Sequence, residues 1–171
     1  PGTVIASGGA NVRMESGGNG DILLGLVDAG TGSVSLVAER DILDNDGGEW
    51  LNVLASALRM EADSNTDGTG QIGQPEAGSS PETNVHAIDT RVATLAATSA
   101  EGIFVLESDG LSVDATPPIT VQRLKSDLST TTITDSSLSD LETTDAGSIE
   151  LRSTTGLLAV NDGDADGSGI L

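Results

Sequence analysis

Short stretches of this chain recur at a distance, and this feature most constrains how the chain can fold. Residues 32–36 (GSVSL) are matched by residues 147–151 (GSIEL), and residues 12–15 (VRME) are matched by residues 58–61 (LRME). Residues 4–7 (VIAS) also return, as VLAS at 53–56. Recurrence of short strand-plus-turn units is typical of proteins that bury their apolar residues by stacking one unit on the next. We therefore expect a stacked architecture.

The units themselves read as β-structure. Short alternating apolar runs are separated by clusters of Gly, Asp, Asn and Ser, which favour turns. Two segments, 92–97 and 124–128, are candidates for short helices, although the first fits a strand equally well. In a parallel β-helix, equivalent residues of successive coils stack about 4.8 Å apart, so sequence echoes are expected there and not in a sandwich.

The predicted fold class is therefore all-β: a parallel β-helix, or solenoid, with its coils stacked along one axis and minimal helix. The 171 residues suffice for one domain. We interpret residues 1–171 as a single solenoid segment excised from a longer repetitive protein, with residues 74–85 as a protruding loop. The core ladders are predicted to contain Val34, Leu36, Ile42, Val53, Ile103, Val105, Ile149 and Leu151.

The composition excludes several classes of partner. A net charge of −20 argues against nucleic acid, because neutralising phosphates requires a basic surface. No apolar run approaches the length that crosses a bilayer, so membrane insertion is not expected. Cysteine is absent, which removes disulfides and thiolate metal sites. Divalent cations are the natural counterions of so acidic a chain.

Two segments place acidic or amide side chains at alternate positions before a glycine. This spacing opens an EF-hand calcium loop, in which alternate side chains converge on the ion. The bidentate Glu expected at the twelfth position is missing, since Gln74 stands there. Two readings stay open: Ca²⁺ bound in a β-turn, or simple solvated turns. The candidate ligands are Asp63, Asn65, Asp67, Asp162, Asp164 and Asp166.

The sequence contains little evidence for a catalytic site. His86 is the only histidine, so neither a His-based zinc site nor a convincing catalytic triad can be assembled around it. Glu101, Glu107 and Asp109 flank one predicted strand, and paired carboxylates serve polysaccharide-cleaving enzymes. One Phe, one Trp and seven Lys plus Arg leave little to line a sugar cleft. We predict that the chain is not an enzyme.

Three motifs carry a resemblance to a known family. They are residues 71–73 (QIG), residues 90–97 (TRVATLAA) and the apolar strand that starts at Ile103 and runs to the turn before Leu111. Together they resemble the repeats of filamentous-haemagglutinin-type giant exoproteins of bacteria. The resemblance covers roughly residues 20–113, returns from 145 and is interrupted at 74–85. It implies an extracellular, right-handed parallel β-helix with an adhesive or fibrous role.

We therefore expect a structural or adhesive segment of a secreted bacterial repeat protein, located outside the cell or on its surface. Residues 166–171 followed by residues 1–15 read like the interior stretch 46–61, which predicts head-to-tail stacking of copies, covalent or not. The expected partners are other copies of the chain, and a surface or polysaccharide. Two alternatives remain: a β-helical polysaccharide-binding or polysaccharide-cleaving protein, and a calcium-binding β-sandwich module of an adhesin.

Overall fold

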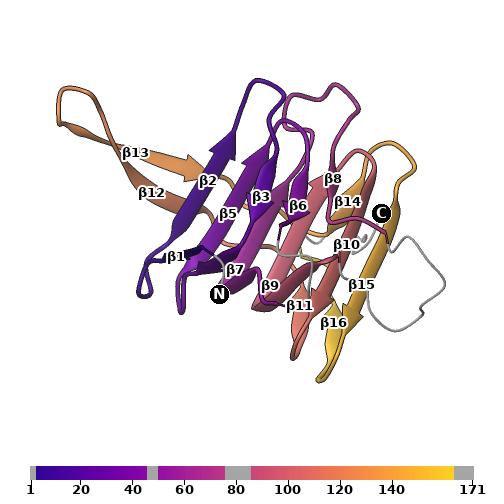
Figure 1. Cartoon of the computed structure of the whole chain (residues 1–171). Coiled ribbons are helices and arrows are strands. Elements are labelled where there is room, and N and C mark those ends of the chain that lie inside the picture. Colours follow the sequence, from indigo (N-terminus) through magenta and orange to yellow (C-terminus); the bar gives the residue numbers. More distant parts are fainter. Residues whose placement is uncertain (1–2, 46–49, 76–85, 164–171) are drawn as a thin grey trace.

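The structure, a computed structural model, describes residues 3–45, 50–75 and 86–163 (Figure 1). These residues form strands and contain no helix, so none of them makes a helical segment able to cross a membrane. The strands are β1 (Val4–Ala6), β2 (Val12–Ser16), β3 (Ile22–Leu24), β4 (Leu26–Asp28), β5 (Ser33–Ala38), β6 (Ile42–Asp44), β7 (Val53–Glu61), β8 (Gln71–Ile72), β9 (Ile88–Ser99), β10 (Gly102–Glu107), β11 (Leu111–Val113), β12 (Ile119–Leu124), β13 (Thr130–Asp135), β14 (Leu141–Thr143), β15 (Ser148–Ser153) and β16 (Leu158–Val160).

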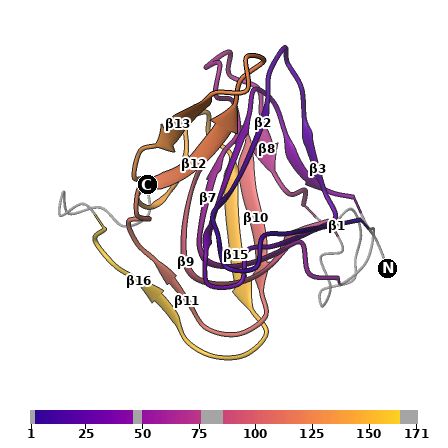
Figure 2. The same ribbon diagram turned by 90° about the vertical axis from the view of Figure 1, so that its left-hand side faces the viewer.

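Fourteen of these strands belong to one large sheet. All the pairings recorded within it are parallel, because each pass of the chain lies beside the previous pass in the same direction. Seen along the direction in which the strands are stacked, the sheet curls around an interior (Figure 2). The expectation of an all-β, parallel architecture is confirmed at this level.

Residues in register across successive strands form columns, which we name by their members. The most uniform is the isoleucine column, in which β3, β6, β8, β10 and β15 each place an isoleucine at the same position. Its members are Ile22, Ile42, Ile72, Ile103 and Ile149. Identical β-branched side chains pack well on a pleated surface, and the first four are buried.

One recurrence in the sequence coincides with this stacking. Strands β2 and β7 both pair with β5, and their registers place residues 12–15 and 58–61 in the same four columns. A second recurrence, 32–36 with 147–151, does not stack, since β5 pairs with β2 and β7 whereas β15 pairs with β10. Glycine is required at the start of both segments for the same steric reason. A Cβ at Gly32 would collide with the carbonyl oxygen of Ala10, and a Cβ at Gly147 would collide with that of Glu101. The third recurrence, 4–7 with 53–56, is one residue out of register, because Ile5 and not Val4 shares a column with Val53.

The predicted core is confirmed in large part. Six of the eight residues expected in it are buried, while Ile149 and Leu151 are half-buried and pack against the same cluster. The six are Val34, Leu36, Ile42, Val53, Ile103 and Val105. Phe104 lies outside this main cluster, in a small group with Ala87 and Leu106. The interior is therefore filled by aliphatic side chains, as the composition predicts.

The helices considered for 92–97 and 124–128 do not form. Residues 92–97 lie inside β9, which pairs with β7 on one side and with β11 and β14 on the other. Pairing on both sides satisfies the backbone and overrides local helix propensity. Residues 124–128 contain the last residue of β12 and the turn after it, where Leu128 has a φ of 66°.

The sheet is open at both sides. Within the described residues, β1, β2 and β3 have a strand partner on one flank only, and the same is true of β14, β15 and β16. Five of the nine exposed large apolar residues that the structure describes lie in these edge strands: Val4, Ile5 and Leu23 on one flank, and Leu158 and Val160 on the other. Unpaired edges carry backbone groups that can pair with another strand.

One hairpin departs from the parallel pattern. Strands β12 and β13 pair antiparallel and form a separate two-stranded sheet, which we call the arm (residues 119–135). The chain leaves the large sheet after β11, forms the arm and returns at β14. The arm crosses the direction of the sheet strands and projects past β2, the strand that flanks the open edge (Figure 1).

Candidate functional site

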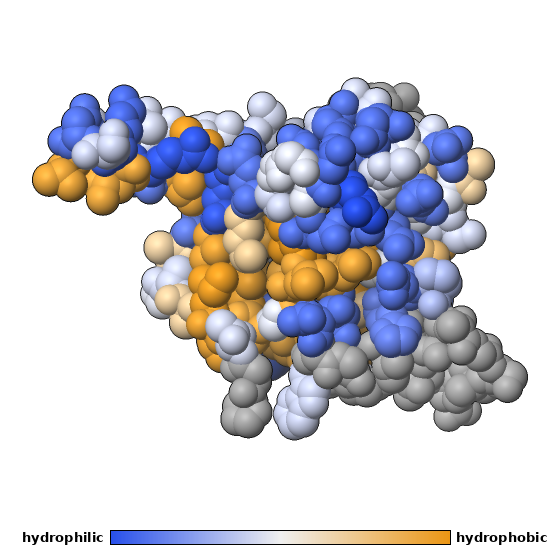
Figure 3. Space-filling model, turned by 45° about the horizontal axis from the view of Figure 1, so that its top comes forward, coloured by the Kyte–Doolittle hydropathy of each residue, from blue (hydrophilic) through white to orange (hydrophobic). Residues whose placement is uncertain are grey.

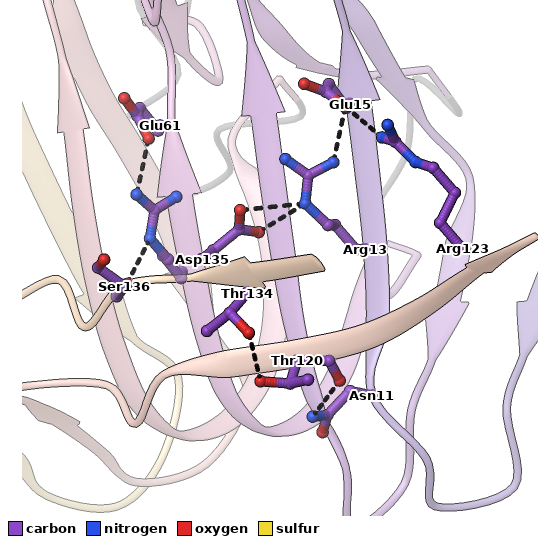
Figure 4. A network of polar contacts seen from close by, with 10 residues as sticks. Asn11, Arg13, Glu15, Glu61, Thr120, Arg123, Thr134, Asp135 and Ser136 are labelled. Carbon is purple, nitrogen blue, oxygen red and sulfur yellow. Dashed lines mark hydrogen bonds and ion pairs between the residues drawn. The ribbon is translucent and has the colours of Figure 1, made fainter. Parts of the chain in front are cut away.

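A network of hydrogen bonds and ion pairs attaches the arm to the large sheet (Figure 4). Arg13 Nε on β2 donates to both carboxylate oxygens of Asp135, at 3.0 and 2.9 Å. Arg59 Nε on β7 donates to the carbonyl oxygen of Ser136 at 3.1 Å. Two arginines two strands apart thus hold the end of the arm's return strand.

Glu15 and Glu61, each two residues after one of these arginines, have their own part in the site. Arg13 bonds Glu15 at 2.8 Å and Arg59 bonds Glu61 at 2.7 Å, each pair within one strand. Burial acts to lower the pKa of Arg13, but its bonds to Glu15 and Asp135 outweigh burial and raise it. The hydrogen bond from Arg13 lowers the pKa of Glu15 below its ordinary value. Both charges of this pair are therefore stabilised at neutral pH.

Two further contacts hold the outgoing strand of the arm. Asn11 Nδ2 donates to the carbonyl oxygen of Thr120 at 3.1 Å, and Arg123 Nη2 lies 2.9 Å from Glu15 (Figure 4). Glu15 therefore bridges a sheet arginine and an arm arginine. The Arg13 and Asp135 side chains are both 11% exposed, whereas Arg123 and Glu15 are about half exposed, so the inner pair is the stronger fastening.

The arm has two unlike faces. Strand β13 alternates between half-buried and exposed residues, with Thr131, Ile133 and Asp135 toward the sheet. Its partner places Ile119, which is buried, and Val121 opposite Asp135 and Ile133. The outer face carries side-chain bonds from Thr120 to Thr134 and from Gln122 to Thr132 (these four residues being exposed). Figure 3 shows the projecting part as apolar on one side and polar on the other.

We expect the Arg13–Asp135 pair to couple the arm to the sheet. In a double-mutant cycle with Arg13→Ala and Asp135→Ala, the coupling energy should be about 1–3 kcal/mol, because both side chains are largely desolvated. The exposed pair Arg91–Asp109 should give about 0.5 kcal/mol. The measurement is urea unfolding of the single and double variants. Equal coupling for both pairs would contradict the assignment.

The antiparallel arm was not predicted from the sequence. Pro117 and Pro118, followed by alternating residues from Ile119, carry a signal of a strand that leaves the main repeat. No local sequence pattern predicts that this strand pairs antiparallel. Nor does one predict that the end of its partner strand is bonded by arginines 122 and 77 residues earlier in the chain.

The predicted calcium ligands near residue 65 hold their own turn together. Asp63 Oδ1 accepts from the backbone N–H groups of Asp67 and Gly68, at 2.8 and 3.2 Å. Asn65 Nδ2 donates to Asp67 Oδ2 at 3.1 Å. The Thr69 hydroxyl, the largest cause, lowers the pKa of Asp67 by bonding its Oδ1. These contacts are those of an Asx-type turn, in which carboxylates accept from nearby N–H groups.

The second predicted cluster is described only in part. Asp162 is exposed, and Asp164 and Asp166 lie outside the described residues. No group of three or more His, Asp or Glu suited to a metal is found among residues 3–45, 50–75 and 86–163. Calcium binding by Asp63, Asn65 and Asp67 therefore stays a prediction.

Calcium and turn formation can be separated by one variant. Asp63→Ala removes the acceptor for two backbone N–H groups, so we expect a loss of about 1–2 kcal/mol of unfolding free energy even without metal. If the turn also holds Ca²⁺, millimolar Ca²⁺ should raise the melting temperature of the unaltered protein and leave Asp63→Ala unchanged. Calorimetric scans with Ca²⁺ and with a chelator measure both. Identical scans of the unaltered protein would refute the calcium prediction.

The three predicted carboxylates near β10 lie in unlike surroundings. Glu107 is buried: its Oε2 accepts from the Thr90 hydroxyl at 2.8 Å and from the Val92 N–H at 3.1 Å. Asp109 lies outside and pairs with Arg91 at 3.0 Å, which lowers the pKa of Asp109. Glu101 is exposed on the turn before β10. His86 precedes β9 and is half-buried.

Comparison with known proteins gave no relative. No protein-family model matches this chain, and no match was found among curated proteins or solved structures.

Proposed function

We propose that the chain is a structural segment of a parallel β-helix, one that extends by stacking a second copy end to end. The observation that carries this proposal is the pair of open flanks. Columns that run through the sheet reach β1, β2 and β3 on one side, and β15 and β16 on the other, and no strand lies beyond them in the part of the chain that the structure describes. Such an interface is heterologous and does not close, so it builds a filament.

The residues at the two ends of each column favour stacking of a second copy in register, so that the columns of one copy continue into the other. One inward column runs Ile5, Val27, Val53, Thr90, Glu107 and Ser153, and another runs Val12, Val34, Leu58, Leu95, Val113 and Val160. Stacking would therefore place Val12 of one copy on Val160 of another and bury both. The apolar residues exposed at the flanks would then lose contact with water, at roughly 25 cal/mol for each Å² buried.

Cysteine cross-linking tests the stacking directly, since the chain has no native cysteine. Ala6 and Thr154 are exposed at opposite flanks of the sheet. Ala6 lies in an outward column with Asp28, Leu54 and Arg91, and Thr154 directly follows Ser153, which is in register with Glu107 and with Thr90, the residue before Arg91. Neighbouring strands lie about 4.8 Å apart, within the Cα separation that a disulfide spans. Under oxidation, a mixture of Ala6→Cys and Thr154→Cys should yield a cross-linked dimer.

The matched control replaces Ala6→Cys by Glu101→Cys, an exposed position on a side turn. This mixture should stay monomeric in a non-reducing gel. Electron microscopy of the unaltered chain should show filaments. Discrete monomers at high concentration, together with no Ala6–Thr154 disulfide, would refute the proposal.

Acidity, the absence of cysteine and the resemblance to filamentous-haemagglutinin-type repeats support an extracellular, adhesive setting for such a filament. The polysaccharide alternative has less support. One of the surface hollows lined by Arg91 contains no aromatic side chain on which a sugar ring could stack; its lining is Leu51, Asp89, Thr90, Arg91, Leu106, Ser108 and Thr154. The β-sandwich alternative is disfavoured by parallel pairing, because sandwiches are antiparallel.

A further inference from the structure

We propose that the arm is a clamp between copies: its projecting part seats on the β14 side of the next copy in the filament. This inference rests on the stacking proposed above and adds the surface that would fasten the joint. The occupant is a second copy of this chain, and the contact joins the arm tip to the outer side of the strands nearest β14.

The inner face of the arm continues past the strand on which it is seated. Asp135 and the Thr120 carbonyl are fixed to β2 through Arg13 and Asn11. Ile133 lies two residues beyond Asp135, and Val121, its partner across the arm, lies one residue beyond Thr120. Two residues of strand advance about 6.7 Å, more than the 4.8 Å between neighbouring strands. The apolar inner face thus extends over the place that the next strand of a stacked copy would occupy.

The column beneath the arm supplies matching charges. Glu15, Val37, Glu61, Thr98 and Glu142 are in register, so acidic residues recur along the line that the arm follows. In this copy the arm already bonds Glu15 through Arg123 and lies beside Arg59, the partner of Glu61. Glu142 on β14 is exposed, at the other end of the same column.

The arm tip carries one positive charge, at Lys125, and one negative charge, at Asp127, which accepts hydrogen bonds from Ser129. Lys125 is the only lysine of a chain with net charge −20, and it lies in the turn between β12 and β13. Lys125 is two residues beyond Arg123, which advances it by about 6.7 Å. Glu142 of a stacked copy would lie one strand spacing from Glu15, about 4.8 Å, and the flexible lysine side chain covers the difference.

A zero-length carbodiimide reaction tests this contact, because it joins an amine to a carboxylate that touches it. Lys125 supplies the only side-chain amine. An adduct between copies that involves Lys125 would therefore show that the arm tip contacts another copy. We expect a Lys125–Glu142 adduct between copies, identified by mass spectrometry of mixed ¹⁴N- and ¹⁵N-labelled protein. Lys125→Arg should lose the adduct and keep the filaments, since the charge remains.

A second variant tests the apolar face. Val121→Thr with Ile133→Thr keeps β-branched shape but removes apolar contact, so the protein concentration needed for assembly should rise about tenfold. The control, Thr132→Ser with Thr134→Ser, alters the outer face and should leave that concentration unchanged. Hydrogen exchange of isolated copies confirms that the arm stays seated in both variants.

The outcomes separate the two proposals. If the Ala6–Thr154 disulfide forms between copies while Lys125 gives no adduct between copies and the threonine variant assembles like the control, the clamp is refuted and stacking stands. If Lys125 joins carboxylates of its own copy only, the clamp is likewise refuted. If the Ala6–Thr154 disulfide does not form, stacking fails and the clamp with it.

Discussion

Replacing Ile103 by alanine should cost about 3–4 kcal/mol of unfolding free energy, the largest single loss we expect in this protein. Ile103 is fully buried and lies in register between Ile72 and Ile149. Truncation removes its apolar contact and leaves a cavity that neighbours on fixed strands cannot close. The measurement is urea unfolding, with the slope compared between variants to verify that the unfolded state is unchanged.

The matched control is Ile149→Ala, which makes the same chemical change in the same column at its open side. Ile149 is only half-buried, so its loss should be about 1–2 kcal/mol. In the filament, where a further strand would cover that flank, the loss at Ile149 should approach that at Ile103. Equal losses in monomeric protein would contradict the picture of one buried column with an open side.

Replacing Glu107 by alanine should cost about 2–4 kcal/mol, although it removes a charge from a strongly acidic protein. The carboxylate accepts from the Thr90 hydroxyl, from the Val92 N–H and, through Oε1, from the Asp109 N–H at 3.0 Å. Alanine leaves these donors without an acceptor in the interior. Glu107→Gln retains one oxygen and most of the volume, and should lose less.

The same residue predicts a pH dependence. Burial, the largest cause, raises the pKa of Glu107 above its ordinary value of 4.5. The folded state therefore binds this proton more tightly than the unfolded state does, and its stabilising contribution is fully present below the ordinary pKa. That contribution is lost as the pH rises from about 4.5 through the raised pKa of the folded state.

Glu107→Gln isolates this effect from the repulsion among the other acidic groups. The stability of the unaltered protein relative to Glu107→Gln should be greatest at low pH and should fall as the pH rises. Urea unfolding of both proteins from pH 4 to pH 8 measures this difference. A difference that does not change with pH would show that the environment of Glu107 does not penalise its charge.

Much of the core could be predicted because the pattern of apolar residues within a strand indicates which of its side chains are buried. Alternation along residues 33–38 and the continuous apolar run at 103–106 both predict buried strands, and Val34, Leu36, Ile103 and Val105 are buried as expected. The repeat of residues 12–15 at 58–61 also indicated true stacking. The candidate calcium turn at Asp63 could be located, but its spacing does not distinguish a metal site from carboxylates that accept from their own backbone.

The sequence alone determined that this protein is built of short strands joined by turns, with an aliphatic interior and parallel repetition. These properties depend on residues close together along the chain, through alternation, turn chemistry and side-chain volume. Only the tertiary structure decided that Glu107 lies inside, that residues 32–36 and 147–151 belong to different parts of the sheet, and that Arg13 and Arg59 receive an antiparallel arm. Each of these depends on which distant segments become neighbours, and a local pattern specifies a face but not its partner.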